Sequence, residues 1–69
     1  MEISYNKLWN ILEERKLSRT ELVHIAGIST NAMAKLGKNE DVRLRVLIKI
    51  SCALDKKIDD IVDYEMNDR

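Results

Sequence analysis

The sequence is poor in the residues that interrupt helices. Its 69 residues include no proline, no phenylalanine and only two glycines. Leucine, isoleucine, lysine, glutamate and aspartate are abundant instead, and this balance favours helix over sheet. The composition therefore predicts an all-α fold.

Cysteine and histidine occur once each, as Cys52 and His24. A single cysteine excludes an internal disulfide, and the pair is too small a set to hold zinc. We expect His24 to be a surface residue and Cys52 to be a packing residue or a half-exposed thiol. No glycine-rich phosphate loop and no nucleophile–base pair is present, so we predict no enzyme, metal, cofactor or small-molecule ligand.

The chain also lacks a long apolar run, since none approaches the roughly 20 residues that cross a bilayer. Met1 is followed by Glu2 rather than by the basic start of a secretory leader. Hydrophobic residues make up 45% and charged residues 35%, a globular composition. We expect one cytoplasmic domain, residues 1–69, with no membrane partner.

Basic and acidic residues are equal in number, so the formal net charge is zero. The distribution is uneven, however. Residues 1–14 carry −2, residues 15–49 carry eight basic against three acidic residues, and residues 50–69 carry −3. A basic middle between acidic ends is compatible either with one basic face or with a mixed, solvated surface.

Apolar residues that recur every three or four positions predict a compact bundle of five short helices. The expected helices cover about 4–16, 18–26, 29–37 and 43–54, followed by a fifth of about seven residues opened by Asp59 and Asp60. We expect Ser4 to cap the first helix. Asp41 is a candidate cap for the fourth, because Arg43 stands where a small capping residue is usual.

The second and third helices have clear start and stop signals. Ser18 and Glu21 have the spacing of a capping box, in which each side chain bonds the other residue's backbone N–H. Gly27 is suited to the left-handed turn that ends a helix, and Ser29 to capping the next one. Two helices joined by a three-residue turn have the helix-turn-helix arrangement, whose second helix enters the major groove in DNA-binding proteins. The spacing alone is equally compatible with an ordinary pair of packed helices.

The fourth helix is apolar around most of its girth. One face carries Leu44, Leu47, Ile48, Ser51 and Leu54, and a second arc carries Val46, Ile50 and Ala53, leaving Arg45, Lys49 and Cys52 as an outer strip. Such a helix must be covered on two sides, by the rest of the fold or by another subunit. A dimer contact is expected either at this second arc or at the last helix, with Tyr64 and Met66. Trp9 is a core-edge residue or an exposed anchor for a partner.

Over residues 8–62 the sequence resembles the lambda-repressor and Cro-like helix-turn-helix family of bacterial and phage regulators. The matching features are Leu22, residues 26–29, Met33 and Leu36, and then Leu44, Leu47, Ile48, residues 53–54, Ile58 and Ile61. The resemblance implies the lambda repressor-like five-helix fold, with the helix-turn-helix at about 18–37. It also implies a sequence-specific DNA-binding regulator that acts as a homodimer on a two-fold symmetric operator, more often as a repressor.

The resemblance makes residues 29–37 the recognition helix. The expected base contacts are Thr30, Asn31, Ala34 and Lys35, on the side of the helix opposite Met33 and Leu36. The expected contacts to the DNA backbone are Ser18, Arg19, Thr20, Lys38, Asn39, Arg43 and Arg45. Four residues depart from the family pattern: Arg19 replaces a glutamine, Val23 replaces an alanine, Gly37 shortens the recognition helix, and Arg43 replaces a small capping residue.

A second reading uses the same fold without DNA affinity. Zero net charge and Gly37 are compatible with a protein-interaction module, such as an antitoxin or an anti-regulator, that binds a protein partner. The basic middle segment favours double-stranded DNA as the partner instead.

Overall fold

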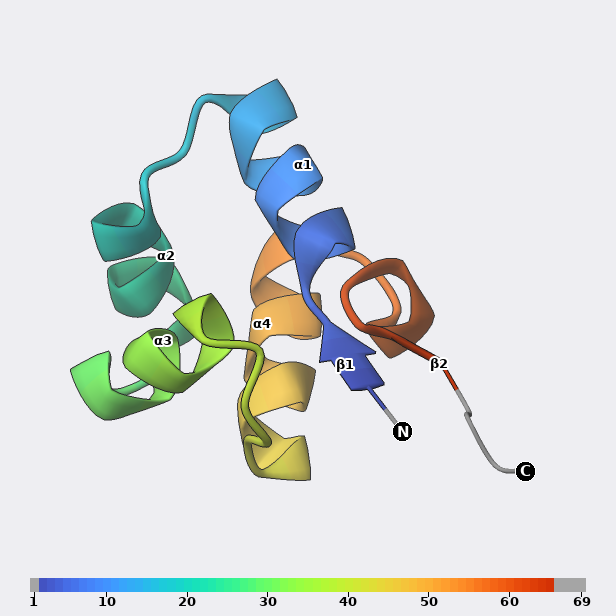
Figure 1. The fold of residues 1–69 in the computed structure, drawn as a ribbon. Coiled ribbons are helices and arrows are strands. Elements are labelled where there is room, and N and C mark those ends of the chain that lie inside the picture. The colour runs from blue at the N-terminus through green and yellow to red at the C-terminus, as the bar shows by residue number, and fades with distance from the viewer. Residues whose placement is uncertain (1, 66–69) are drawn as a thin grey trace.

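The computed structural model describes residues 2–65, which form helices and one short ribbon of two strands (Figure 1). The elements, in chain order, are β1 (Glu2–Ser4), α1 (Asn6–Arg15), α2 (Arg19–Ala26), α3 (Thr30–Gly37), α4 (Leu44–Leu54), the 3₁₀ turn η1 (Ile58–Asp60) and β2 (Asp63–Glu65). The mostly helical class predicted from the composition is confirmed.

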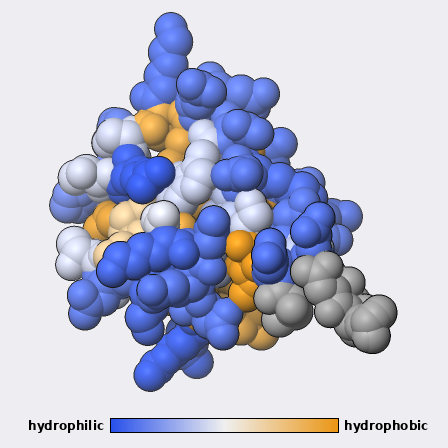
Figure 2. All heavy atoms as spheres, viewed as in Figure 1, coloured by the Kyte–Doolittle hydropathy of each residue, from blue (hydrophilic) through white to orange (hydrophobic). Residues whose placement is uncertain are grey.

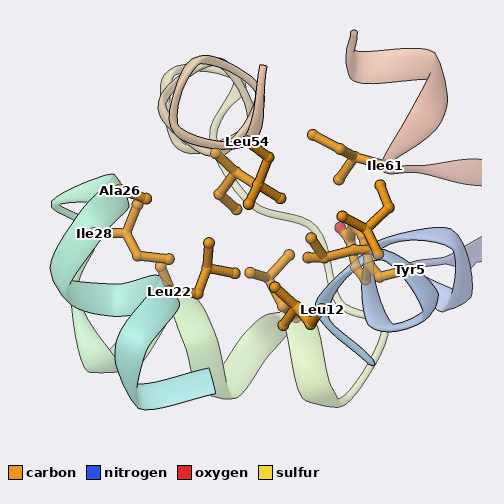
Figure 3. Packing of buried hydrophobic residues seen from close by; sticks show 12 residues of the cluster. Tyr5, Leu12, Leu22, Ala26, Ile28, Leu54 and Ile61 are labelled. Carbon is orange, nitrogen blue, oxygen red and sulfur yellow. The ribbon is translucent and has the colours of Figure 1, made fainter. Parts of the chain in front are cut away.

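Helix α4 runs through the middle of the molecule, with α2 and α3 on one side and the β1–β2 ribbon on the other (Figure 1). Apolar side chains from α1 to α4, together with Ile61 just after η1, converge on a single core, shown in close-up in Figure 3. Leu8, Leu22, Leu36 and Ile50 are fully buried within it. Burying such side chains is the main source of stability in a domain this small.

The prediction of a fifth α-helix is wrong. Residues Ile58–Asp60 form only one 3₁₀ turn, in which Asp60 Oδ2 accepts a hydrogen bond from the Lys57 backbone N–H at 3.2 Å. The chain then becomes β2, which pairs antiparallel with β1 so that Ile3 lies opposite Tyr64. The ribbon replaces the remainder of the expected helix, and Met66 lies outside the described residues.

The first helix also begins later than expected, because Ser4 belongs to β1. Ser4 Oγ accepts a hydrogen bond from the backbone N–H of Asn6 at 3.2 Å. Ser4 therefore contacts the first residue of α1 although it lies two residues before it. Tyr5, between the two elements, is buried in the core with 1% of its surface exposed.

The face of α4 that packs inward combines residues from both apolar arcs described in the sequence. Ile50 and Leu54 are buried, whereas Leu44 and Ile48 are 62% and 44% exposed. Arg43 is the residue that caps α4, without a side-chain hydrogen bond, and Asp41 does not cap it. Because α4 is apolar on nearly every side, its sequence pattern does not select the face that packs inward. Figure 2 shows small patches of exposed apolar residues on a surface that is otherwise mostly hydrophilic in this view.

Tyr5 attaches the start of α1 to the loop between α3 and α4. Its hydroxyl donates to the Glu40 carbonyl at 2.7 Å, and its backbone N–H donates to Asn39 Oδ1 at 3.3 Å. Burial raises the pKa of the Tyr5 phenol, and the nearby Asp41 carboxylate raises it further. The loop that follows α3 is thus held by two hydrogen bonds from the N-terminal part of the chain.

Candidate nucleic-acid interface

Side-chain caps fix the starts of both helices of the helix-turn-helix. Ser18 Oγ accepts from the Glu21 backbone N–H at 3.0 Å, while Glu21 Oε1 accepts from the Ser18 N–H at 2.8 Å. Ser29 Oγ accepts from the Ala32 N–H at 3.1 Å. Each cap is worth about 1 kcal/mol of helix stability, so α2 and α3 begin at fixed residues.

Gly27 sets the turn between these helices. Its φ of 68° is left-handed, and its N–H donates to the Val23 carbonyl at 3.0 Å, as does the Ile28 N–H at 3.2 Å. A Cβ at Gly27 would meet nothing within 4 Å, so the glycine is required by the backbone angle and not by lack of space. The capping box, the glycine turn and the Ser29 cap predicted from the sequence are all confirmed.

One side of α3 is free of the bundle. The exposed residues on it are Thr30, Asn31, Ala34 and Lys35. On the opposite side Ala32 and Leu36 are buried and Met33 is half-buried. The four side chains predicted to face bases therefore face outward on consecutive turns, where amide, ammonium and methyl groups suit base edges of the major groove.

A groove of about 430 Å³ separates this side of α3 from the start of α4. Asn31 and Lys35 line it from α3, and Arg43, Arg45 and Lys49 line it from α4 and its cap. None of the described residues that line it is acidic. The groove thus joins two of the four predicted base-contacting residues to two predicted backbone-contacting arginines and has the positive charge that attracts phosphate.

Lys49 is a member of this site that the sequence reasoning left out. It lies one turn beyond Arg45 on α4, and its Nζ donates to the Gly27 carbonyl at 3.4 Å. That bond draws the ammonium toward the turn of the helix-turn-helix. The spacing of four between Arg45 and Lys49 in the outer strip was the available signal, because residues four apart share a helix face.

The other predicted backbone contacts lie outside the groove. Ser18, Thr20 and Lys38 are exposed at the start of α2 and the end of α3. The Ser18 hydroxyl already accepts the α2 cap bond. Asn39 has a left-handed φ of 57°, and its Oδ1 accepts from Tyr5, so its first role is to hold the loop.

Arg19 lies against Trp9 of α1. Its guanidinium carbon is 4.0 Å from the centroid of the tryptophan ring, within the range of a cation–π contact. Trp9 is half-buried and packs against the core. The core-edge role expected for Trp9 is confirmed, and its exposed ring face contacts Arg19 of the same chain.

The remaining polar candidates are dispersed. His24 and Cys52 are both exposed, on α2 and α4. Within residues 2–65, no three His, Cys, Asp or Glu side chains come together as a metal site would require. Over the same residues, no helix combines the length and apolar character needed to cross a bilayer.

The surfaces considered for a dimer contact have different exposure. In the second arc of α4, Ile50 is buried while Val46 and Ala53 are half-buried, so this arc packs against the chain's own core. Tyr64 is 59% exposed on β2. The apolar side chains that α4 leaves exposed are Leu44 and Ile48, which are one turn apart.

Residues 7–67 match the family model of the Cro/C1-type HTH DNA-binding domain. A crystal structure of the transcriptional regulator VanUg is similar, with 44% sequence identity and a TM-score of 0.86 over 90% of this chain and 83% of that one. None of the curated sequences matches significantly. With nearly its whole length matched and its helix-turn-helix formed, the chain belongs to the Cro/C1-type helix-turn-helix DNA-binding family.

Proposed function

We propose that this protein is a sequence-specific transcriptional regulator that inserts α3 into the major groove of DNA. The observation that carries the proposal is the exposed side of α3, with Asn31 and Lys35 beside a groove lined by Arg43, Arg45 and Lys49. Asn31 would read adenine and Lys35 guanine, while the α4 cations would bind the flanking phosphates. The similarity to the regulator VanUg supports the same role.

We further propose that the protein acts in the cytoplasm as a homodimeric repressor. A single recognition helix of eight residues touches few bases, and pairing two copies doubles the site that is read. Two-fold symmetry of the protein would then appear in the operator as an inverted repeat, with half-sites about 10 base pairs apart from centre to centre.

Selection of bound fragments from a random oligonucleotide pool tests this proposal. We expect an inverted repeat to be enriched. We also expect the logarithm of the binding constant to fall with the logarithm of salt concentration with a slope on the order of −4 to −5 per protomer, because roughly five phosphate contacts release about 0.9 counterions each. Absence of any enriched sequence would contradict sequence-specific binding.

Zero net charge favours a second candidate function. A regulator that binds DNA tightly usually gains from an overall positive charge, and this chain has none, which suits an antitoxin or anti-regulator that binds a protein. Titration of random duplex at low salt separates the two functions. Failure to bind at micromolar protein would favour the protein-interaction module.

A further inference from the structure

The side chain of Arg19 lies between two other helices. Arg19 is the first residue of α2, and its guanidinium carbon lies 4.0 Å over the ring of Trp9 from α1. On α3, a Cβ built on Gly37 would stand 3.1 Å from Arg19 Nη1, which is tighter than ordinary van der Waals contact. Arg19 is nevertheless exposed to solvent.

Gly37 has no backbone reason to be glycine. It is the last residue of α3, and Gly27 is the glycine with a positive φ. At a helical position alanine is the better helix former. A Cβ at Gly37 would displace the Arg19 guanidinium by a few tenths of an ångström, so the missing side chain lets the guanidinium lie close against the end of α3.

A stacked guanidinium remains able to bind phosphate. A guanidinium whose flat face rests on a ring keeps its N–H donors free, because they lie in the plane of the group and point outward from its edge. An arginine held in this way has already lost much of its rotamer freedom, so less entropy is lost when it binds an anion. Its position at the start of α2 lies beside the exposed residues Ser18 and Thr20.

We propose that Trp9 and Gly37 are positioning residues that hold Arg19 ready to bind a DNA phosphate next to the α3 interface. Trp9 supplies the ring face on which the guanidinium rests, and Gly37 supplies the space at the end of α3. This inference rests on the proposed DNA-binding function. It adds to that function a contact that depends on three separate helices.

The test measures binding of a random-sequence duplex at several salt concentrations. Arg19→Ala should reduce the magnitude of the salt slope by about 0.9, the value for one phosphate contact. Arg15→Ala is the matched control, because it removes the same charge from the far end of α1, and its slope should stay close to that of the wild type. Equal slopes for the two variants would overturn the proposal.

Variants of the two positioning residues test the mechanism. Trp9→Leu and Gly37→Ala should each weaken binding roughly two- to fivefold, the range expected for an exposed cation–π contact, and neither should weaken it further when Arg19 is already alanine. Trp9→Phe should retain most of the affinity. Gly37→Ala should also raise the melting temperature, since alanine favours the helix. Loss of affinity with a gain in stability separates positioning from a general structural effect.

The free protein offers a second readout, because Trp9 is the single tryptophan of the chain. Arg19→Ala should change the tryptophan emission in the absence of DNA, and unchanged emission would overturn the stacking on which the proposal depends. Wild-type protein that binds no duplex would overturn the proposed function, and this inference with it. Wild-type binding that Trp9→Leu and Gly37→Ala leave unaltered would overturn the positioning roles alone.

Discussion

Asn31 on α3 and Lys38, which caps the end of α3, occupy positions that predict different roles. Asn31 lies on the exposed side next to the cationic groove, where its amide can pair with a base, whereas Lys38 follows the last turn and is placed for phosphate. We expect Asn31→Ala to weaken binding of the selected site by about 1–3 kcal/mol with little effect on random duplex. Lys38→Ala should weaken both alike. Titration of both variants on both duplexes checks this, and equal losses would reject the division of roles.

Tyr5 is expected to make the free energy of unfolding fall at alkaline pH. Its pKa is raised in the folded state above the usual value of about 10, so the unfolded chain loses the phenolic proton first as pH increases. Stability is therefore fully present below pH of about 10 and falls as pH rises through the folded-state pKa. Tyr5→Phe should cost about 1 kcal/mol at neutral pH, because the Glu40 carbonyl loses its donor, and should lessen the alkaline fall.

Urea unfolding of both proteins at neutral pH and above a pH of about 10 measures this difference. Lysine side chains also titrate in alkali, so the comparison with Tyr5→Phe isolates the phenol. Parallel losses of stability in the two proteins would show that Tyr5 does not contribute to the pH dependence.

Among the elements, the β1–β2 ribbon carries an unfavourable pair. Glu2 and Glu65 lie opposite each other in the register, both exposed, and like charges at directly opposed positions destabilise a strand pair. Glu65→Lys should increase the free energy of unfolding by about 0.2–1 kcal/mol. Glu65→Gln is the control and should give a smaller gain. Denaturant unfolding measures both, and a loss of stability in the lysine variant would contradict the pairing.

The helix-turn-helix was the most predictable part of the fold, because its signals are local. The capping partners Ser18 and Glu21 are three residues apart, and Gly27 is recognisable by its own backbone requirement. The ribbon was not predictable, because two strands of three residues, over 50 positions apart, have no repeating pattern to detect. The contact of Arg19 with Trp9 depends on how α1 and α2 are packed, which spacing within one helix does not encode.

For the molecule as a whole, the exposed row of Leu44 and Ile48 on α4 is where we expect two copies to meet. Replacing both with serine should change the stability of the monomer by only about 0.5 kcal/mol each, because these positions face solvent. Sedimentation should then show a monomer at concentrations where we expect the wild type to be a dimer, together with weaker binding to the proposed inverted repeat. A double variant that stays dimeric would show that the dimer contact lies on another surface. Tyr64→Ser on β2 is the matching control.

The register of the ribbon places the first and last described residues of the chain, Glu2 and Glu65, at the same spot. Figure 1 shows this spot across α4 from α3. Glu2 and Glu65 therefore lie on the side turned away from the exposed face of α3. A bulky label attached at either residue should consequently leave duplex binding as strong as it is in the unlabelled protein.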